Sequence, residues 1–256
     1  MQDGGSTETG IKSLATGFRI CETLADADGA TVTEVASATG LAKSTAHEHL
    51  QTMVANEFAT QSPDGVYELS LRFLDFGKYV QNQRAVTEVA GEVIEQLAAE
   101  TGEAVWLVVE EHGWGVYLMR AMGENAFRIQ SRVGERSHLH CLAAGKALLA
   151  ALGAGRVDEV VDRRGLPEFT PNTITDRETL GDELEGIRDR EVAFNENEEI
   201  QGVRGVGAAI VAEGTLNGAV GIGGPENRMR GEYFREELPN LLLGATNEIE
   251  LRLAYS

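Results

Sequence analysis

Two predicted helices joined by a glycine turn constrain the fold of the first 70 residues more than any other feature. Thr31 and Glu34 are spaced as a capping box, in which each side chain accepts a hydrogen bond from a free backbone amide where a helix begins. The helix that follows ends at Gly40, and a second helix is predicted from about Ser44 to Asn56. Two helices with so short a turn between them are typical of a helix-turn-helix.

The flanking segments predict the winged form of this motif. A run of apolar residues at helical spacing precedes the two helices, and one face of that predicted helix holds Ile11, Leu14, Ala15, Phe18, Cys21 and Leu24. After the helices, two short apolar runs flank a turn at residues 62–65, which predicts a hairpin from Phe58 to Leu69. We therefore expect a disordered lead at residues 1–10 and a winged helix-turn-helix domain at residues 11–70.

The pattern changes beyond residue 70, where a linker helix at residues 71–84 and a helix at residues 86–100 are predicted first. Alternating apolar residues then predict five strands, near residues 104–109, 115–119, 127–131, 205–211 and 218–223. Helical spacing predicts further helices near residues 142–151, 156–163 and 176–190, and from residue 232 onward. Because strands and helices do not alternate regularly, we expect an α+β domain with an antiparallel sheet at residues 85–256.

The charge balance is strongly acidic. The chain has 41 Asp and Glu residues against 22 Lys and Arg, a formal net charge of -19, and only four of its basic residues are lysines. An acidic and lysine-poor composition is typical of proteins that work at molar salt, where carboxylates keep chains hydrated and mutually repelled. The composition thus indicates a halophilic protein, with an ordinary acidic protein as the alternative.

Composition also limits where the protein is expected to act. No run of about eighteen apolar residues occurs that could span a bilayer. The first residues are polar and acidic, unlike a secretory signal. We therefore expect a cytoplasmic protein with no membrane partner. Cys21 and Cys141 lie far apart in apolar surroundings, which favours two core thiols over a disulfide.

Motifs for catalysis are missing from the sequence. The glycine-rich segments at residues 202–207 and 218–224 do not fit a dinucleotide-binding fingerprint. His138, His140 and Cys141 are residue types that bind zinc, but no fourth ligand occurs at a recognisable spacing. The alternative for these three residues is a strand edge that runs into the following helix. We expect no enzyme activity, no cofactor and no metal.

The order of these parts, and the residues that fill them, resemble the IclR family of transcriptional regulators over about residues 11–254. The more specific matches lie in the second domain and follow the family's order: Val133-Gly134, Leu139-His140, Ala144-Gly145-Lys146-Ala147, Thr173-Ile174-Thr175, Gly202-Val203-Arg204 and Gly224-Pro225. The resemblance implies a homodimer or a dimer of dimers that binds a roughly palindromic double-stranded DNA operator. It also implies that the second domain, similar to GAF domains, accepts a small organic ligand, expected to be an organic acid, which modulates operator binding.

The resemblance places the DNA-binding residues on or beside the outward face of the helix after Gly40: Lys43, Ser44, Thr45, His47, Glu48, Gln51 and Thr52. Family members commonly have arginine where this chain has Glu48, which either accepts a hydrogen bond from a cytosine amine or is a solvated surface glutamate. Residues 1–75 carry four basic side chains against eleven acidic ones, a poor match to DNA in dilute salt. The alternative function is a ligand-sensing or protein-interaction module that no longer binds DNA.

Positions carried over from the family's effector pocket are Ala126, Ile129, Ala143, Ala144, Asn195, Gly205, Gly221 and Gly223. Asn195 replaces an acidic residue of some members, and Gly221 and Gly223 replace serines. Free amides at the helix start near Ala143 can hold an anion. The glycines either enlarge the pocket for a bulkier ligand or only pack strands, in which case the pocket is vestigial. Lys146 is interpreted as structural, with its ammonium near a carboxylate or a helix end.

Overall fold

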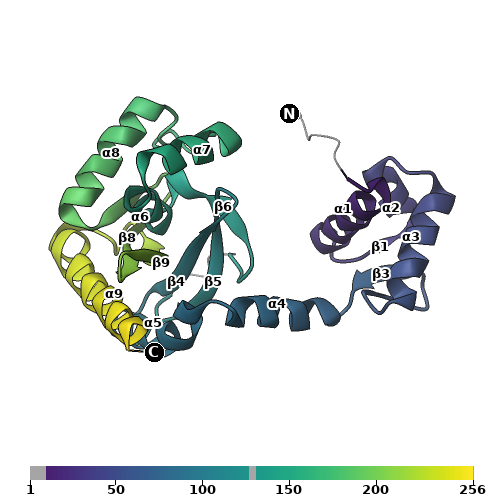
Figure 1. Ribbon diagram of the computed structural model, residues 1–256, viewed down its shortest axis with the longest axis horizontal. Helices are drawn as coiled ribbons and strands as arrows, with labels where there is room; N and C mark the ends of the chain where they lie inside the picture. The colour runs from purple at the N-terminus through teal and green to yellow at the C-terminus, as the bar shows by residue number, and fades with distance from the viewer. Residues whose placement is uncertain (1–9, 127–130, 256) are drawn as a thin grey trace. The chain divides into compact units, whose positions relative to one another are not determined.

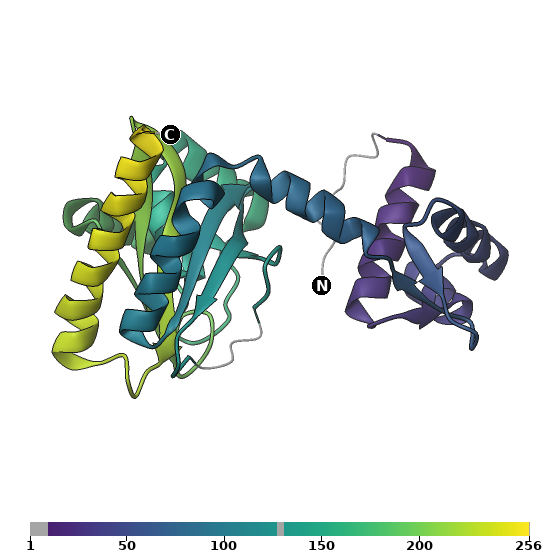
Figure 2. The same ribbon diagram turned by 90° about the horizontal axis from the view of Figure 1, so that it is seen from below.

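The computed structural model describes residues 10–126 and 131–255 of the chain. The chain divides into two compact units, with the division between Val80 and Gln81. Figures 1 and 2 show both units from two directions. Ile129, and most of the strand expected at residues 127–131, lie outside the described residues.

The first unit is a winged helix-turn-helix, as the sequence predicts. Its elements are α1 (Lys12–Asp26), β1 (Ala30–Thr31), α2 (Val32–Thr39), α3 (Lys43–Ala55), β2 (Ala59–Gln61) and β3 (Val66–Leu69). The three strands form an antiparallel sheet in the order β1-β3-β2. Strand β1 was not predicted, because two residues are too few to show an alternating pattern.

The start of α2 is held by the predicted capping box. The Thr31 hydroxyl accepts from the Glu34 amide at 3.4 Å, and the Glu34 carboxylate accepts from the Thr31 amide at 2.8 Å. The bond from the Thr31 backbone lowers the pKa of Glu34. At the other end Gly40 takes a left-handed conformation, with φ of 70°, and its amide donates to the Ala36 carbonyl. These two ends fix the length of α2 and the turn before α3.

Removal of this cap should weaken the first unit measurably. We expect Thr31→Ala to lower its free energy of unfolding by about 1 kcal/mol, because the Glu34 amide loses its acceptor. Urea unfolding followed by circular dichroism measures the change. Thr33→Ala, an exposed threonine of the same helix, is the matched control and should change little. Equal losses in the two variants would show that the cap does not stabilise the helix.

The predicted buried face of α1 is partly wrong. The side chains of Ile20 and Leu24 are buried against α2, α3 and β3, whereas Ile11, Leu14 and Phe18 are 71%, 56% and 61% exposed. Apolar residues therefore occupy two stripes of α1, and helical spacing alone does not tell which stripe packs within the chain.

The second unit is an α+β domain with an antiparallel sheet, which confirms the predicted class. The helix α4 (Arg72–Asn82) spans the division between the units. The remaining elements are α5 (Ala85–Thr101), β4 (Ala104–Glu111), β5 (Trp114–Met122), β6 (Arg136–His138), the 3-10 turn η1 (Leu139–Cys141), α6 (Ala143–Ala151), α7 (Ala154–Arg164), α8 (Arg177–Arg190), β7 (Ala193–Glu196), β8 (Val203–Ala212), β9 (Thr215–Pro225), the π turn η2 (Tyr233–Glu237) and α9 (Leu238–Ala254).

The six strands of this unit follow the order β6-β5-β4-β9-β8-β7. On one face, α5 and α9 lie side by side and pack on residues such as Leu107, Val206 and Ile222 (Figure 2). On the other face, α6, α7 and α8 cover residues such as Trp106 and Val108 (Figure 1). Within the described residues, no helix is both long and apolar enough to cross a membrane.

Candidate DNA-binding face and effector pocket

The outward face of α3 carries most of the residues that the sequence analysis assigned to DNA. Ala46 and Leu50 are buried and hold the helix on the unit. Thr45 is partly buried, and the remaining six assigned residues are exposed: Lys43, Ser44, His47, Glu48, Gln51 and Thr52. The helix begins after Ala42, whose methyl group cannot cap backbone amides, so the first turn offers free N–H groups. Such a helix start is suited to a phosphate oxygen.

Two of these side chains are already engaged within the unit. The Gln51 side-chain nitrogen donates to the hydroxyl of buried Tyr67 on β3 at 2.7 Å. The Thr52 hydroxyl donates to the backbone carbonyl of Glu48, also at 2.7 Å. Gln51 therefore keeps its carbonyl oxygen for another partner, and the contact with Tyr67 fixes the hairpin against α3.

A small pocket of about 70 Å³ lies between the sheet and the start of α6. Six of the positions carried over from the family line it together: Ala143, Ala144, Asn195, Gly205, Gly221 and Gly223. Ala126 is not among the lining residues. The structure adds further lining residues that the sequence analysis did not assign, chiefly Trp106, Tyr117, Ser131, Leu142 and Glu199. Trp106 and Tyr117 lie on the same face of β4 and β5 because the pairing of these strands shifts register after Leu107, which strand alternation does not reveal.

Close packing, rather than extra space, explains the glycines of this pocket. A Cβ on Gly205 would lie 2.8 Å from the Ile222 carbonyl oxygen, and one on Gly221 would lie 3.1 Å from the Ala144 methyl. The Ile222 carbonyl oxygen and the Ala144 methyl already occupy the space that these side chains would take. At Gly221, one of the two glycines expected to enlarge the pocket, the close contact with Ala144 leaves little room beyond the backbone.

Asn195 uses both ends of its amide to join two walls of the pocket. Its nitrogen donates to the Cys141 carbonyl at 2.6 Å, and its oxygen accepts from the Glu198 amide at 3.0 Å. These bonds fix the segment before α6 and the loop after β7. Asn195 thus positions the pocket, and only one N–H of its side chain is left for a ligand.

Both an acidic and a basic side chain lie in or beside the pocket. Glu199 contributes a carboxyl group, which accepts a hydrogen bond from the Ser137 hydroxyl at 2.6 Å. Burial raises the pKa of Glu199 above its ordinary value, and nearby Glu135 adds to the shift. The guanidinium of Arg120 lies 5.3 Å from the centre of the Trp106 ring and donates to the Ser131 carbonyl. Arg120 is exposed and is not among the residues that line the pocket.

The raised pKa of Glu199 predicts a pH-dependent stability. Between the ordinary glutamate pKa and the raised one, the folded state holds a proton that the unfolded state has released, so stability falls as the pH rises. Glu199→Gln should therefore match the parent near about pH 4 and have a higher unfolding midpoint at about pH 8. Thermal unfolding across this range measures the difference. The hydrogen bond from Ser137 lowers the pKa of Glu199, so its loss in Ser137→Ala should raise this pKa further and make stability depend more steeply on pH. Parallel curves for the parent and both variants would contradict a raised pKa at Glu199.

Comparison with known proteins decides the family. The family model described as "Bacterial transcriptional regulator IclR C-terminal" matches residues 78–251, and the one described as "IclR helix-turn-helix domain" matches residues 13–63. The chain belongs to the IclR family of transcriptional regulators. It is a DNA-binding regulator with a ligand-binding C-terminal domain, and its relatives in the family are regulators rather than enzymes.

Individual members of the IclR family are similar over almost the whole chain. A probable HTH-type transcriptional regulator, ArcR, of Halobacterium salinarum is 30% identical over 95% of this chain and 94% of its own length. The IclR structure of Thermotoga maritima gives a TM-score of 0.78 at 27% identity, covering 95% of this chain and 99% of that one. An IclR homolog of Microbacterium hydrocarbonoxydans, complexed with 4-hydroxybenzoate, gives 0.83 at 25% identity and covers 95% and 100%.

Two histidines of this IclR-family chain, His138 and His140, lie at an edge of the sheet. His138 ends β6, and its ring packs at 4.7 Å between centres on Trp114. The His140 ring nitrogen lies 3.0 Å from the Pro167 carbonyl oxygen. Burial lowers the pKa of His138 to about 4. Across residues 10–126 and 131–255, no three His, Cys, Asp or Glu side chains are grouped closely enough for a metal ion. His138 ends strand β6, and His140 and Cys141 lie in the η1 turn that leads into α6.

Lys146 lies in α6 and has a structural role, as predicted from the sequence. Its ammonium is buried and lies 2.7 Å from the Glu198 carboxylate and 3.3 Å from that of Glu183. Cys141, also close to this helix, is a buried free thiol whose pKa is raised by burial. Cys21 is also a free thiol but is only partly buried.

Proposed function

We propose that this regulator binds a roughly palindromic double-stranded DNA operator through α3, and that a short organic acid under α6 alters this binding. The domain limits of the proposal are residues 11–70 for the DNA-binding domain, 71–84 for the linker helix and 85–256 for the effector domain. The observation that supports it most directly is the convergence of the six carried-over positions on one pocket. Gene regulation would place the protein in the cytoplasm.

The proposed contacts to DNA divide by chemistry. Ser44, Thr45 and the free amides of the first turn of α3 hold a phosphate, and Lys43 adds a charge at the same end. His47 and Glu48 stand exposed on the next turn and face the bases, with Glu48 suited to a cytosine amine. Thr52 and the free oxygen of Gln51 complete the surface.

The exposed apolar stripe of α1 supports the proposed homodimer. Ile11, Leu14 and Phe18 lie on this stripe. Leu71, just before α4, is 84% exposed, and Tyr79, within α4, is 65% exposed. Apolar side chains gathered on the surface of a soluble domain mark a contact with another protein. A dimer, alone or paired again as a dimer of dimers, would present two α3 helices to a two-fold operator.

The proposed DNA contacts are tested by fluorescence anisotropy with the DNA upstream of the protein's own gene at about 2 M KCl. The triple variant Ser44→Ala, Thr45→Ala, His47→Ala should bind at least about tenfold more weakly than the parent, since each good contact contributes about 1 kcal/mol or more. Ser37→Ala, exposed on α2, is the control and should bind as the parent does. Unchanged binding of the triple variant would refute this face.

The ligand proposal rests on the size and polarity of the pocket. A dry cavity of about 150 Å³ holds a benzene ring, so a pocket of about 70 Å³ suits an acid of about two to four carbons unless its walls move apart. The carboxylate would meet the amides of Ala143 and Ala144 at the start of α6. Glu199 would accept a hydrogen bond from a hydroxyl group at the other end of the ligand.

Calorimetric titration separates the possible ligands. Lactate should bind about tenfold more tightly than propanoate, which lacks the hydroxyl, and Glu199→Gln should reduce this preference. Binding of 4-hydroxybenzoate alone would show that the walls open to an aromatic acid, as the ligand of the Microbacterium relative would suggest. No binding of any of the three would support a vestigial pocket.

A second candidate function rests on charge. Residues 1–75 have a net charge of -7, and Glu48 adds a negative charge to the proposed DNA face. These charges are consistent with a ligand-sensing or protein-interaction module that forms no sequence-specific DNA complex at any salt. The composition equally supports a halophilic DNA-binding protein, because at molar salt the screening length falls to about 3 Å and repulsion by phosphate is suppressed.

A further inference from the structure

Strand β8 is longer than the edge strand that pairs with it. β7 pairs with β8 only from Arg204 to Gly207, whereas β8 continues to Ala212 and stays paired with β9 on its other side. In the described part of the chain, nothing pairs with β8 as a strand on the β7 side beyond Gly207. The second half of β8 is therefore an open sheet edge.

The direction of the backbone groups along this edge follows from the pairing. The Val203 carbonyl accepts from the Asn197 amide on the β7 side. In an antiparallel strand the groups of alternate residues point to the same side, so those of Gly205, Ala209 and Val211 share this direction. The Val211 amide is held by a side chain, the Glu250 carboxylate, at 2.6 Å. Ala209 thus presents an amide and a carbonyl, and Val211 a carbonyl, to the open edge.

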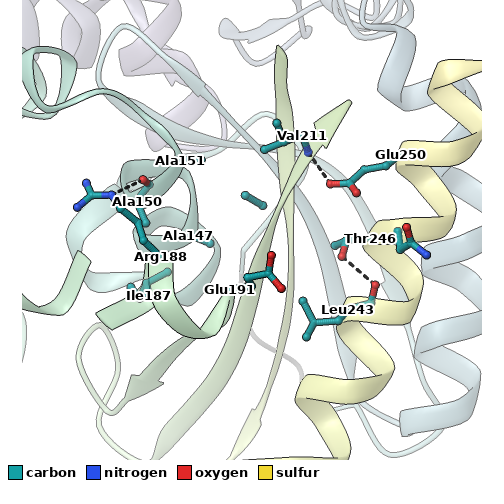
Figure 3. A pocket seen from close by; sticks show the side chains of 12 residues that line it. Ala147, Ala150, Ala151, Ile187, Arg188, Glu191, Val211, Leu243, Thr246 and Glu250 are labelled. Atoms are coloured by element: carbon teal, nitrogen blue, oxygen red, sulfur yellow. Dashed lines mark hydrogen bonds between the residues drawn. The ribbon is translucent and has the colours of Figure 1, made fainter. Parts of the chain in front are cut away.

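A groove of about 540 Å³ runs along these residues. The last turns of α6 and α8 form one wall, where Ala147 and Ala151 leave room, and α9 forms the other (Figure 3). Figure 3 shows Glu191 reaching into the gap from the α8 side and Glu250 from α9. The groove therefore lies alongside the open half of β8.

The charges around the groove indicate which kind of peptide segment it would bind. Two carboxylates, Glu191 and Glu250, face one guanidinium, Arg188, whose Nε is occupied by the Ala150 carbonyl at 2.9 Å. The carboxyl ends of α6 and α8 add partial negative charge on the same wall. A segment with a basic side chain is attracted.

We propose that this groove binds an extended basic segment of a partner protein, which adds as a strand to β8 at Ala209 and Val211. The segment forms main-chain hydrogen bonds with the open edge, in the way that exposed strands accept peptides. An arginine or lysine of the segment lies between Glu191 and Glu250, and small apolar residues on either side face the alanines of α6. This surface is separate from the DNA-binding face and from the effector pocket.

The proposal is tested on the full-length protein with three fluorescent seven-residue peptides. The first alternates alanine and valine around a central arginine, the second has a central glutamate, and the third repeats the first with every other amide N-methylated. By anisotropy the first peptide should bind at least about tenfold more tightly than either of the others, because only it offers both charge and strand bonds. In the complex, hydrogen exchange at the Ala209 amide should slow.

Charge-matched variants locate the binding site. Glu191→Gln should weaken the first peptide several-fold, whereas Asp189→Asn, which removes the same charge from an exposed neighbour outside the groove, should not. Absence of binding by the first peptide, equal binding of the N-methylated peptide, or equal effects of the two variants would overturn the proposal. A change in oligomeric state caused by Glu191→Gln alone would also overturn it, because the groove would then join copies of this chain.

Discussion

Replacement of Lys146 by methionine is expected to lower the free energy of unfolding of the second unit by about 3 to 5 kcal/mol. The ammonium is only 2% exposed and balances the carboxylate of Glu198 at 2.7 Å and that of Glu183 at 3.3 Å. Methionine preserves the volume but leaves Glu198 buried without its cation. Among the described residues the second oxygen of Glu198 lacks a hydrogen-bond partner, and the first would keep only the Glu196 amide at 3.3 Å. Urea unfolding at neutral pH measures the loss.

Two controls distinguish lost charge pairing from lost packing. The double variant Lys146→Met, Glu198→Gln should recover more than half of the loss, since it removes the unpaired charge. Burial raises the pKa of Glu198, so acidification toward the ordinary glutamate pKa protonates it in the folded state and should shrink the effect of Lys146→Met. A Lys146→Met variant as stable as the parent at neutral pH would show that the buried pair contributes nothing to folding.

Gly207→Ala is expected to cost about 3 kcal/mol or more and to abolish ligand binding. A Cβ at this position of β8 would lie 2.4 Å from both the Ala143 carbonyl carbon and the Ala144 amide nitrogen, which are backbone atoms that cannot rotate away. The start of α6 must then move off the sheet. Because that start forms one wall of the pocket, stability and ligand affinity should fall together, as unfolding and calorimetry would show.

A glycine elsewhere in the unit provides the matched control. Gly181 lies exposed within α8, and a Cβ there would meet nothing within 4 Å. Gly181→Ala should stabilise the unit by about 0.5 to 1 kcal/mol, because alanine loses less backbone entropy in a helix. If Gly207→Ala were tolerated as well as Gly181→Ala, the close contact between β8 and α6 would not be what shapes the pocket.

Local signals in the sequence were sufficient to predict the helices of the first unit, but not to predict which side of α1 is exposed. The capping box at Thr31 and the left-handed turn at Gly40 depend on neighbouring residues only, and both formed as predicted. The packed stripe of α1 depends on which side meets α2 and α3, so Ile11 and Phe18 were wrongly grouped with the buried Leu24. Short edge strands such as β6 and β7 give too few residues for an alternating pattern.

The pocket could be predicted where it depends on the family's motifs and not where it depends on tertiary contacts. Ala143 and Asn195 were placed by resemblance and do meet. Trp106 and Tyr117 come together only because β4 pairs with β5, with a register shift after Leu107. The raised pKa of Glu199 results from its burial, which no local sequence pattern reveals.

The central claim is that an acidic winged helix reads a specific operator. The most direct test is footprinting of the parent protein on the DNA upstream of its own gene at about 0.2 and about 2 M KCl. We expect a specific protected site at the higher salt, where screening removes the repulsion between phosphate and the first unit. Absence of a protected site at both salt concentrations, with the protein folded, would contradict operator binding at this DNA and favour the sensing module.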